Sequence, residues 1–524
     1  MAIAGLNSLR IARQRALAVV CVVLFLTFLD NTVVSVVLAG VQADLSAGVQ
    51  ALQWIINGYM LAFAALMLSG GTLGDILGRK KVMLSGVGLF LVGSAIAMLA
   101  TSPGILTVGR VVMGVGAAAS EPGTLSMIRH LFPQRQARAR ALGVWAAVSS
   151  IALAFGPVVG GLIIGFSNWR GVFVFNLVVG AVAFILGIKL LPESADPRGR
   201  RLDIVGLVLG AAAMALASFA IIQGESSGYK TWWIDVLFAV SLLTLGLFIA
   251  WERRAKDPAL ELKFFRKPAF SGANFVAFAT NFGLFAIFFF TALFLSIVAG
   301  FSGYDIAIAF IAMSAAMVLS TLLAGRWVSK RGPAGPMIVG CFLAGIGVFI
   351  VEVVLKPDVG TAMLAWPLAL AGFGFGMTMV SATATVLSVV PARRSGMAAS
   401  SFNMFRELGG VFGVAVLGAI MNGQLTQQLV RKLVALGLPH DFQSLVIYAI
   451  THGGNLPANS HVSAGAVLAH PQLVGQVTDA AYQAFGDGLS ICLKLAGALL
   501  LLSGVVAVFT MRGPALARHR QEYL

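Results

Sequence analysis

Hydrophobic residues in this chain form long, continuous runs that short polar segments separate. A run of about 20 apolar residues can cross a bilayer as a helix, because each residue rises about 1.5 Å and the hydrocarbon core is about 30 Å thick. Barrel strands would instead alternate apolar and polar positions over about 10 residues. The pattern therefore predicts an all-α polytopic membrane protein with about fourteen spans. These spans are expected at residues 16–38, 52–70, 82–101, 105–126, 141–163, 171–191, 204–223, 233–251, 269–298, 304–327, 337–355, 362–390, 397–421 and 487–511.

The composition excludes an ordinary soluble protein. Of the 524 residues, 59% are hydrophobic and 11% are charged, whereas a soluble domain has roughly 25% charged residues. The net charge of +16 is compatible with nucleic-acid binding, but the basic residues lie in loops between the apolar runs. The three cysteines are too few and too scattered for a disulfide framework or a zinc site. We therefore expect no metal, no cofactor and no nucleic-acid partner.

Lysine and arginine residues gather in alternate loops, and short cytoplasmic loops carry an excess of these residues. The basic side holds both chain ends and residues 79–81, 129–140, 198–201, 253–267, 330–331 and 393–394. The opposite loops offer little beyond Lys230, Lys356, Arg431 and Lys432. We therefore predict a multi-pass protein of the cell membrane with both termini in the cytoplasm. The basic surface also suits contact with anionic membrane lipids.

Two loops on the basic side repeat one pattern. Residues 71–81 and residues 325–333 each place two glycines seven positions apart, next to basic residues. Internal repeats of this kind are typical of transporters, whose substrate site lies between the two halves near the midplane of the bilayer. The repeat predicts two six-helix units with two further helices inserted between them.

The repeat also sets the expected domain boundaries. Residues 1–203 are expected to form the first six-helix bundle, and residues 204–252 the two inserted membrane helices. Residues 253–524 are expected to form the second bundle, including an extracytoplasmic loop at 422–486. This loop is polar and contains three prolines, so we expect a partly helical cap or a mobile segment.

Four motifs carry a resemblance to a known family. They are Leu29–Val34 (LDNTVV), Gly71–Lys81, Arg110–Gly116 (RVVMGVG) and Ala152–Gly161 (ALAFGPVVGG). Together they resemble the major facilitator superfamily and, within it, the fourteen-helix drug:proton antiporter family. The resemblance covers nearly the whole chain except the long outer loop. It implies the major facilitator fold and proton-coupled export of small hydrophobic or cationic compounds by alternating access.

The chain departs from the family pattern at several positions. Met113 stands where the family has Gln, Ala152 where it has Gly, and Ser329 where the second loop copy has Asp. In the first span, Ser35 and Ala39 replace an expected Asn and Pro. These departures leave the substrate range open.

Three charged residues inside the predicted spans are candidates for proton coupling. Asp30 lies slightly outward of the centre of its span, and Arg110 lies at a similar depth, so we predict that they pair. Acids within membrane spans usually face a cavity and carry ions or protons. Because the arginine keeps its charge, it would tune the acid and not itself carry the proton. Glu121 lies three turns after Arg110 on the same helix face. A purely structural role is the plainer alternative for Asp30 and Arg110, and Glu121 can instead attract a cationic substrate.

The candidate substrate site comprises Asn31, Glu407, Phe282 and Phe285. Glu407 is a third acid within a span and can attract a cationic compound. The plainer alternative is that Glu407 and its neighbour Arg406 point in different directions and bind other helices. The two phenylalanines belong to a stripe at residues 278–289 that suits apolar or cationic ligands, or ordinary packing.

Two sets of small and charged residues are predicted to act mechanically. Close helix approach is expected at Gly156, Gly160 and Gly161, together with a missing backbone donor at Pro157. Such a seam can seal one end of a cavity. The loop containing Gly71, Asp75, Gly78 and Arg79 is implied by the resemblance to act as a latch that stabilises the outward-open state. Helix packing and a purely topological role are the respective alternatives.

The sequence favours a transporter over an enzyme. It contains no Gly-x-x-x-x-Gly-Lys-Ser/Thr motif, so direct use of ATP is not expected. We predict a monomeric exporter of small molecules that is driven by protons. A dedicated exporter of one endogenous metabolite, lipid or antibiotic is the alternative, and a receptor or scaffold without transport is a remote one.

Overall fold

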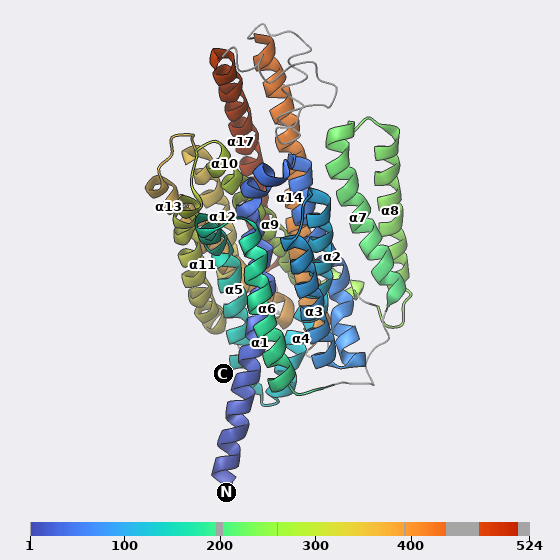
Figure 1. The fold of residues 1–524 in the computed structure, drawn as a ribbon. Coiled ribbons are helices and arrows are strands. Elements are labelled where there is room, and N and C mark those ends of the chain that lie inside the picture. The colour runs from blue at the N-terminus through green and yellow to red at the C-terminus, as the bar shows by residue number, and fades with distance from the viewer. Residues whose placement is uncertain (1, 195–202, 259, 392–394, 436–470, 512–524) are drawn as a thin grey trace.

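The protein is a bundle of long helices that stand side by side (Figure 1). The computed structural model describes residues 2–194, 203–258, 260–391, 395–435 and 471–511. Within these ranges, 14 helices are long and apolar enough to cross a membrane, and no residue lies in a β-strand. The predicted all-α class and the predicted number of spans are thus confirmed.

The first six helices pack closely because small residues line their contacts. They are α1 (Ala2–Leu45), α2 (Val49–Leu77), α3 (Arg79–Met98), α4 (Pro103–Leu131), α5 (Arg135–Phe166) and α6 (Arg170–Leu190). Between α3 and α4, a Cβ atom added to Gly93 would lie 2.7 Å from the carbonyl oxygen of Gly109, so these backbones nearly touch. Close approach of this kind lets helices gain packing energy inside a membrane, where no hydrophobic force drives them together.

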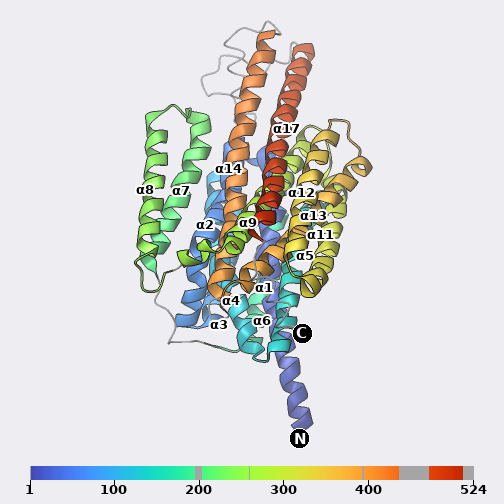
Figure 2. The same ribbon diagram turned by 180° about the vertical axis from the view of Figure 1, so that it is seen from behind.

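Helices α7 (Ile204–Ser227) and α8 (Trp232–Glu252) form a pair at the edge of the bundle. Figures 1 and 2 both show this pair beside α2 and α14, with α8 on the far side of α7. Helix α7 contacts both α2 and α14, whereas α8 packs chiefly on α7. Only 22% of an 18-residue stretch of α7 and 17% of such a stretch of α8 is buried, so both helices present most of their surface to lipid.

The remaining helices begin after a short surface segment. They are η1 (Leu262–Arg266), α9 (Pro268–Phe285), η2 (Ala286–Thr291), α10 (Ala292–Ile297), α11 (Gly303–Arg331), α12 (Ala334–Val354), α13 (Thr361–Ser388), α14 (Ser395–Ala435) and α17 (Pro471–Thr510). The segments α9, η2 and α10 form one span, and an 18-residue stretch of it is 94% buried. Its middle segment, η2, is a π-helix, and π-helical turns are frequent at functional sites.

Several helices extend beyond the boundaries that hydropathy predicts. Helix α2 continues to Leu77, so the predicted loop at 71–81 is reduced to a break at Gly78. Helix α14 continues to Ala435 and α17 begins at Pro471, so helix occupies both ends of the predicted loop 422–486. Polar residues mark where a helix leaves the hydrocarbon, and the helix itself can continue into water. The rest of that loop, residues 436–470, lies outside the described residues.

Two pairs of helices join the early and late parts of the chain. Helix α5 packs on α11, and α2 packs on α14. In the first pair, a Cβ atom on Gly161 would lie 2.9 Å from the backbone nitrogen of Ala307. The hydroxyl of Ser314 in α11 also donates a hydrogen bond to the carbonyl oxygen of Ala154 in α5. These two seams flank the polar centre of the molecule.

Candidate functional site

A buried ion pair joins α1 and α4. Asp30 and Arg110 are both 0% exposed, and the Nη1 atom of Arg110 lies 2.5 Å from the Oδ2 atom of Asp30. The amide of Asn176 in α6 donates to the other carboxylate oxygen of Asp30 at 2.6 Å. The predicted contact between Asp30 and Arg110 is therefore present and direct, and each oxygen of the carboxylate has a partner.

Helix α2 holds the guanidinium group of Arg110 from the other side. The Nε atom of Arg110 donates to the carbonyl oxygen of Ile55 at 3.2 Å. The guanidinium carbon also lies 4.3 Å from the centroid of the Tyr59 ring, a cation–π contact. The hydroxyl of Tyr59 donates to the carbonyl oxygen of Thr27 in α1 at 3.1 Å. The charge is thus held in place by contacts from α1, α2 and α4.

A second ion pair lies on α14 and faces the first group of helices. Arg406 Nη2 lies 2.7 Å from Glu407 Oε1, and the exposed fractions of the two residues are 4% and 0%. Asn31 in α1 donates to both oxygens of Glu407, at 3.2 and 2.9 Å. The guanidinium carbon of Arg406 lies 4.4 Å from the Phe28 ring centroid. The alternative in which Arg406 and Glu407 point apart is wrong, because the long arginine side chain folds back to its neighbour.

The third acid also bridges α4 and α14. Glu121 is 1% exposed, and its Oε1 atom accepts a hydrogen bond from the amide of Asn403 at 3.0 Å. Its Oε2 atom has no hydrogen-bond partner among the described residues. Asn403 and Glu407 lie four positions apart on α14, on one face of the helix. One face of α14 thus contacts an acid from α4 and an amide from α1.

The predicted phenylalanines lie in a helix contact. Phe282 and Phe285 of α9 are 5% and 0% exposed. A Cβ atom on Gly410 of α14 would lie 3.1 Å from the Phe285 ring, and one on Gly413 would lie 3.1 Å from the Cα atom of Phe282. The structure therefore shows them packing α9 against α14, and a contact with substrate stays a prediction.

The predicted glycines of α5 lie against two different helices. Gly156 and Gly160 pack on Thr32 and Val33 of α1, whereas Gly161 packs on α11. Pro157 lies inside a helix that continues without a break from Arg135 to Phe166. The close approach is present, and a role in sealing a cavity stays a prediction.

The segment around Gly78 is anchored to the end of α6. Gly78 has φ +108°, a value that favours glycine. Glu193 accepts a hydrogen bond from the backbone nitrogen of Lys80 at 3.1 Å, and the backbone nitrogen of Arg79 donates to Ser194 at 2.8 Å. The backbones of Gly71 and Asp75 lie in α2. The side chain of Asp75 is outside the described part, so its predicted role stays untested.

Sequence reasoning missed several polar residues of the centre. Tyr59 and Asn403 contact the ionised groups, yet neither belongs to a motif that indicates a partner. Asn57 and Asn281 are 0% and 1% exposed, and neither amide group has a hydrogen-bond partner within the described ranges. Buried amides of this kind usually bind water or a ligand. In the sequence, the position of these residues inside apolar runs was the signal that could have identified them.

The motifs and the arrangement of helices agree with a match over residues 20–414 to the Major Facilitator Superfamily. The chain belongs to this superfamily. Its members are transporters and not enzymes, so the polar centre is a candidate transport site in a multi-pass membrane protein.

Curated relatives and a solved structure are similar to the chain over most of its length. The methylenomycin A resistance protein of Bacillus subtilis is 32% identical, over 77% of this chain and 87% of its own length. The tetracenomycin C resistance and export protein of Streptomyces glaucescens is 28% identical, over 97% and 93%. A bacterial homolog of the human lysosomal transporter Spinster, in an inward-facing and unoccupied conformation, has a TM-score of 0.63 at 18% identity, over 95% and 98%.

Proposed function

We propose that this protein is a proton-coupled antiporter that exports small hydrophobic or cationic compounds from the cell by alternating access. The observation that carries the proposal is the fully buried Asp30 carboxylate, which one arginine and one amide hold within the first group of helices. The resistance and export functions in the names of the relatives support the direction and the type of cargo.

Protonation of Asp30 would change the forces on Arg110. The carboxylate attracts the guanidinium at 2.5 Å, and a proton on the acid removes the charge that gives this attraction. Arg110 keeps its own charge in either case. It would then rely on the Tyr59 ring and the Ile55 carbonyl oxygen, which both belong to α2. The two protonation states therefore favour different positions of α1 relative to α2 and α4.

Asn31 connects this change to the other half of the molecule. It follows Asp30 directly in α1, and its amide donates to both oxygens of Glu407. A shift of α1 would therefore stretch or release the contact with α14. In this proposal, the division at residues 203 and 253 separates two units that rock against each other, with α5–α11 and α2–α14 as their seams.

Glu121 and Glu407 supply the attraction for a cationic compound. One oxygen of Glu121 has no hydrogen-bond partner among the described residues, so the carboxylate can accept a bond from a ligand. Phe28 and Trp145 lie nearby, with ring centroids 6.4 Å apart in an edge-to-face arrangement. Aromatic faces next to a carboxylate suit flat, lipophilic cations. Phe282 and Phe285 would contribute only if α9 and α14 separate during the cycle.

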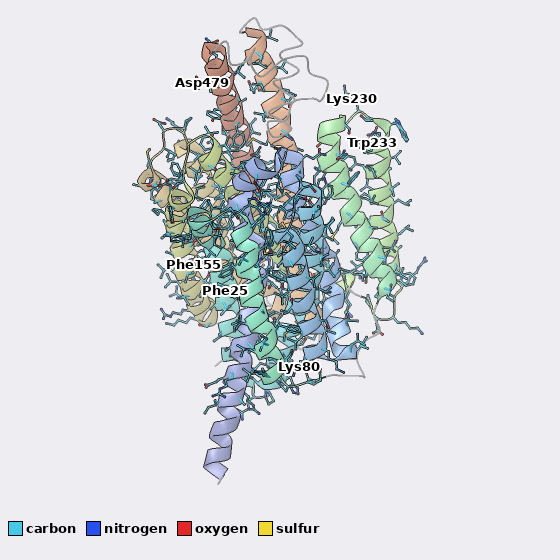
Figure 3. The ribbon with its side chains drawn as sticks, in the orientation of Figure 1. Phe25, Lys80, Phe155, Lys230, Trp233 and Asp479 are labelled. Atoms are coloured by element: carbon cyan, nitrogen blue, oxygen red, sulfur yellow. The ribbon has the colours of Figure 1, made fainter. Side chains whose placement is uncertain are left out.

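The distribution of charge supports an orientation with both termini in the cytoplasm. Figure 3 shows Lys80 at one end of the bundle, and Lys230 and Asp479 at the opposite end. The end that holds Lys80 is the end with the excess of Lys and Arg in short loops. Glu121 follows Arg110 along α4 toward that end, so it would face compounds that enter from the cytoplasm.

Transport by purified protein in liposomes tests the proposal. With an imposed pH gradient, the wild type is expected to accumulate a lipophilic cation, and Asp30→Asn is expected to lose this accumulation. Glu352→Gln is the matched control, because Glu352 lies in α12 and bonds Ser490 away from the centre. Gradient-driven accumulation by Asp30→Asn at the wild-type rate would contradict the proposal.

Export of one dedicated compound is the second candidate. It is favoured by relatives whose names specify a single antibiotic, methylenomycin A or tetracenomycin C. A panel of unrelated compounds in the same liposomes separates the two candidates. Transport of many of them supports a multidrug exporter, and transport of one chemical type supports a dedicated one.

A further inference from the structure

A cavity lies between the inserted helix pair and the main bundle. Its volume is about 320 Å³. Its walls come from α2, α7, α8, α14 and the surface segment that follows α8. Figure 2 shows α7 and α8 beside α2 and α14, with α7 the nearer of the two. The cavity is therefore located at one of the two seams between the halves of the molecule.

The lining of this cavity is apolar throughout. Met214, Phe248 and Met404 are typical of the residues that form its walls, and no charged residue contributes. The volume falls within the range of pockets that hold small ligands, about 300–1,000 Å³. Because α7 and α8 are largely exposed to lipid, the nearest abundant apolar molecule is a membrane lipid. An acyl chain fits such a space by shape and by polarity.

The surface segment at one end of the cavity carries exposed positive charges. Leu260 and Phe265 line the cavity, and Arg253, Arg254 and Arg266 on the same segment are exposed. These three arginines form no ion pair with any described residue. Basic clusters at the end of membrane helices bind anionic headgroups. The apolar walls match the acyl chain of an anionic lipid, and the arginines at their end match its headgroup.

Two carboxylates near this end, Asp203 and Glu252, are already engaged by the protein. Asp203 accepts hydrogen bonds from the backbone nitrogen of Gly206 at 2.9 Å and from the Trp251 indole at 2.7 Å. Glu252 accepts one from the backbone nitrogen of Leu260 at 3.2 Å. They cap α7 and tie the surface segment to α8. The exposed cations of residues 253–267 outnumber the one half-buried acid of this segment, Asp257, so its surface charge is positive.

We propose that this cavity is a binding site for an anionic phospholipid of the adjacent leaflet, with an acyl chain between α7, α8 and α14 and the headgroup at Arg253, Arg254 and Arg266. The site does not depend on proton coupling or on the identity of the exported compound. It does depend on this end of the bundle lying at a membrane surface.

The bound chain would touch the helix that carries the second ion pair. Met404, Phe405 and Leu408 of α14 line the cavity, whereas Arg406 and Glu407 on the same two turns face the polar centre. A lipid in the cavity would contact α14 on the face opposite to the polar centre. It would therefore bias the position of α14 relative to α2.

The test is native mass spectrometry of the full chain released from nanodiscs that contain equal amounts of phosphatidylglycerol and phosphatidylcholine. The wild type is expected to retain one phosphatidylglycerol molecule in preference to phosphatidylcholine. A triple variant, R253Q/R254Q/R266Q, is expected to retain about fivefold less for each charge removed, the equivalent of about 1 kcal/mol per cation. The control R326Q/K330Q/R331Q removes three exposed cations from α11 and is expected to change nothing.

A second pair of variants tests the cavity itself. Gly210→Leu places a side chain in the cavity, where the added Cβ would meet the Phe248 ring at 3.3 Å. Gly246→Leu is the matched control on α8, because an added Cβ there meets no atom within 4 Å. Gly210→Leu is expected to lose the bound lipid and Gly246→Leu to keep it. Met214→Phe fills the same cavity if Gly210→Leu does not fold.

Three results would overturn the proposal. One is equal retention of the two phospholipids by the wild type. Another is equal retention of phosphatidylglycerol by the filled and control variants. The third is displacement of the lipid by tetraphenylphosphonium at the concentration at which it is transported, which would assign the cavity to the exported compound.

Discussion

The two buried ion pairs differ in what surrounds them. Asp30 and Arg110 are held entirely by the first group of helices, through Asn176, Tyr59 and Ile55. Arg406 and Glu407 belong to α14, yet their other contacts come from α1. The first pair is therefore internal to the group α1–α6, and the second joins this group to α14.

In the proposed transport cycle, this difference gives the two chemically similar pairs different roles. A pair inside one half can bind and release a proton without opening the boundary. A pair across the boundary responds when the halves move, because its partners lie on the other side. Asn31 is the link, since it follows Asp30 in α1 and contacts Glu407 in α14. The variants below are ordered by the expected size of their effect on this arrangement.

Removal of Arg110 should have the largest effect. In Arg110→Ala the Asp30 carboxylate keeps only the Asn176 bond, and a broken buried pair costs about 3–5 kcal/mol of folding free energy. The pH dependence of transport should also shift, because the charge that tunes the acid is gone. Thermal unfolding in detergent and transport over a range of pH values measure both effects.

Arg406→Ala is the comparison for that variant. Glu407 would keep its two contacts with Asn31, so the loss of stability should be smaller than for Arg110→Ala. Equal destabilisation by the two variants would contradict the distinction between an internal and a boundary pair.

Removal of the Asn31 amide should have the next largest effect. Hydrogen bonds to charged groups contribute about 1.5–3 kcal/mol, and Asn31→Ala removes both bonds to Glu407. Gradient-driven transport should fall more than substrate binding does, because this residue connects the halves. A double-mutant cycle with Glu407→Gln measures the coupling. Additive effects of the two changes would show that Asn31 and Glu407 do not act together.

Neutralisation of Glu407 should act selectively on cationic cargo. Glu407→Gln keeps the size of the side chain but removes its charge from the centre. Transport of a monovalent lipophilic cation should fall about tenfold, the equivalent of about 1.4 kcal/mol. Transport of a neutral compound of similar size should change little. The ratio of the two rates is the measurement, and an equal fall for both compounds would assign Glu407 a structural role alone.

The smallest effect is expected at the α5–α11 seam. In Gly161→Ala the added methyl group would meet the Ala307 backbone at 2.9 Å, and overpacking of this kind costs about 1 kcal/mol or more. Gly143→Ala on the same helix is the control, since an added Cβ there has no neighbour within 4 Å. Gly161→Ala should therefore unfold at a lower temperature than Gly143→Ala. Identical midpoints would show that the seam tolerates expansion.

Hydropathy and charge were sufficient to predict the fold, because a membrane leaves few alternatives to long apolar helices. The same arguments predicted that Asp30 meets Arg110, since two opposite charges at one depth in hydrocarbon stabilise each other. They placed the end of α2 too early, because residues 71–77, which include two glycines and Asp75, remain helical beyond the predicted span. The sequence was sufficient to predict the depth at which a residue lies in the membrane. It was not sufficient to predict where a helix ends once it has left the membrane.

The sequence could not predict which side chains the buried amides contact. Asn176 and Asn403 each sit in an apolar run, and nothing local indicates that one meets Asp30 and the other Glu121. Those contacts depend on how helices rotate and tilt against one another. The alternative in which Arg406 points away from Glu407 was wrong for a related reason, because a long side chain can fold back to its neighbour in the helix.

The central claim is that Asp30 exchanges a proton with water as the cargo crosses. The most direct measurement uses sealed liposomes that contain a trapped pH indicator and carry no initial pH gradient. An imposed gradient of a transported lipophilic cation should drive protons in the opposite direction in the wild type, and no such proton movement should occur with Asp30→Asn. Proton movement of wild-type size in the Asp30→Asn protein, at an equal rate of cation transport, would contradict the account.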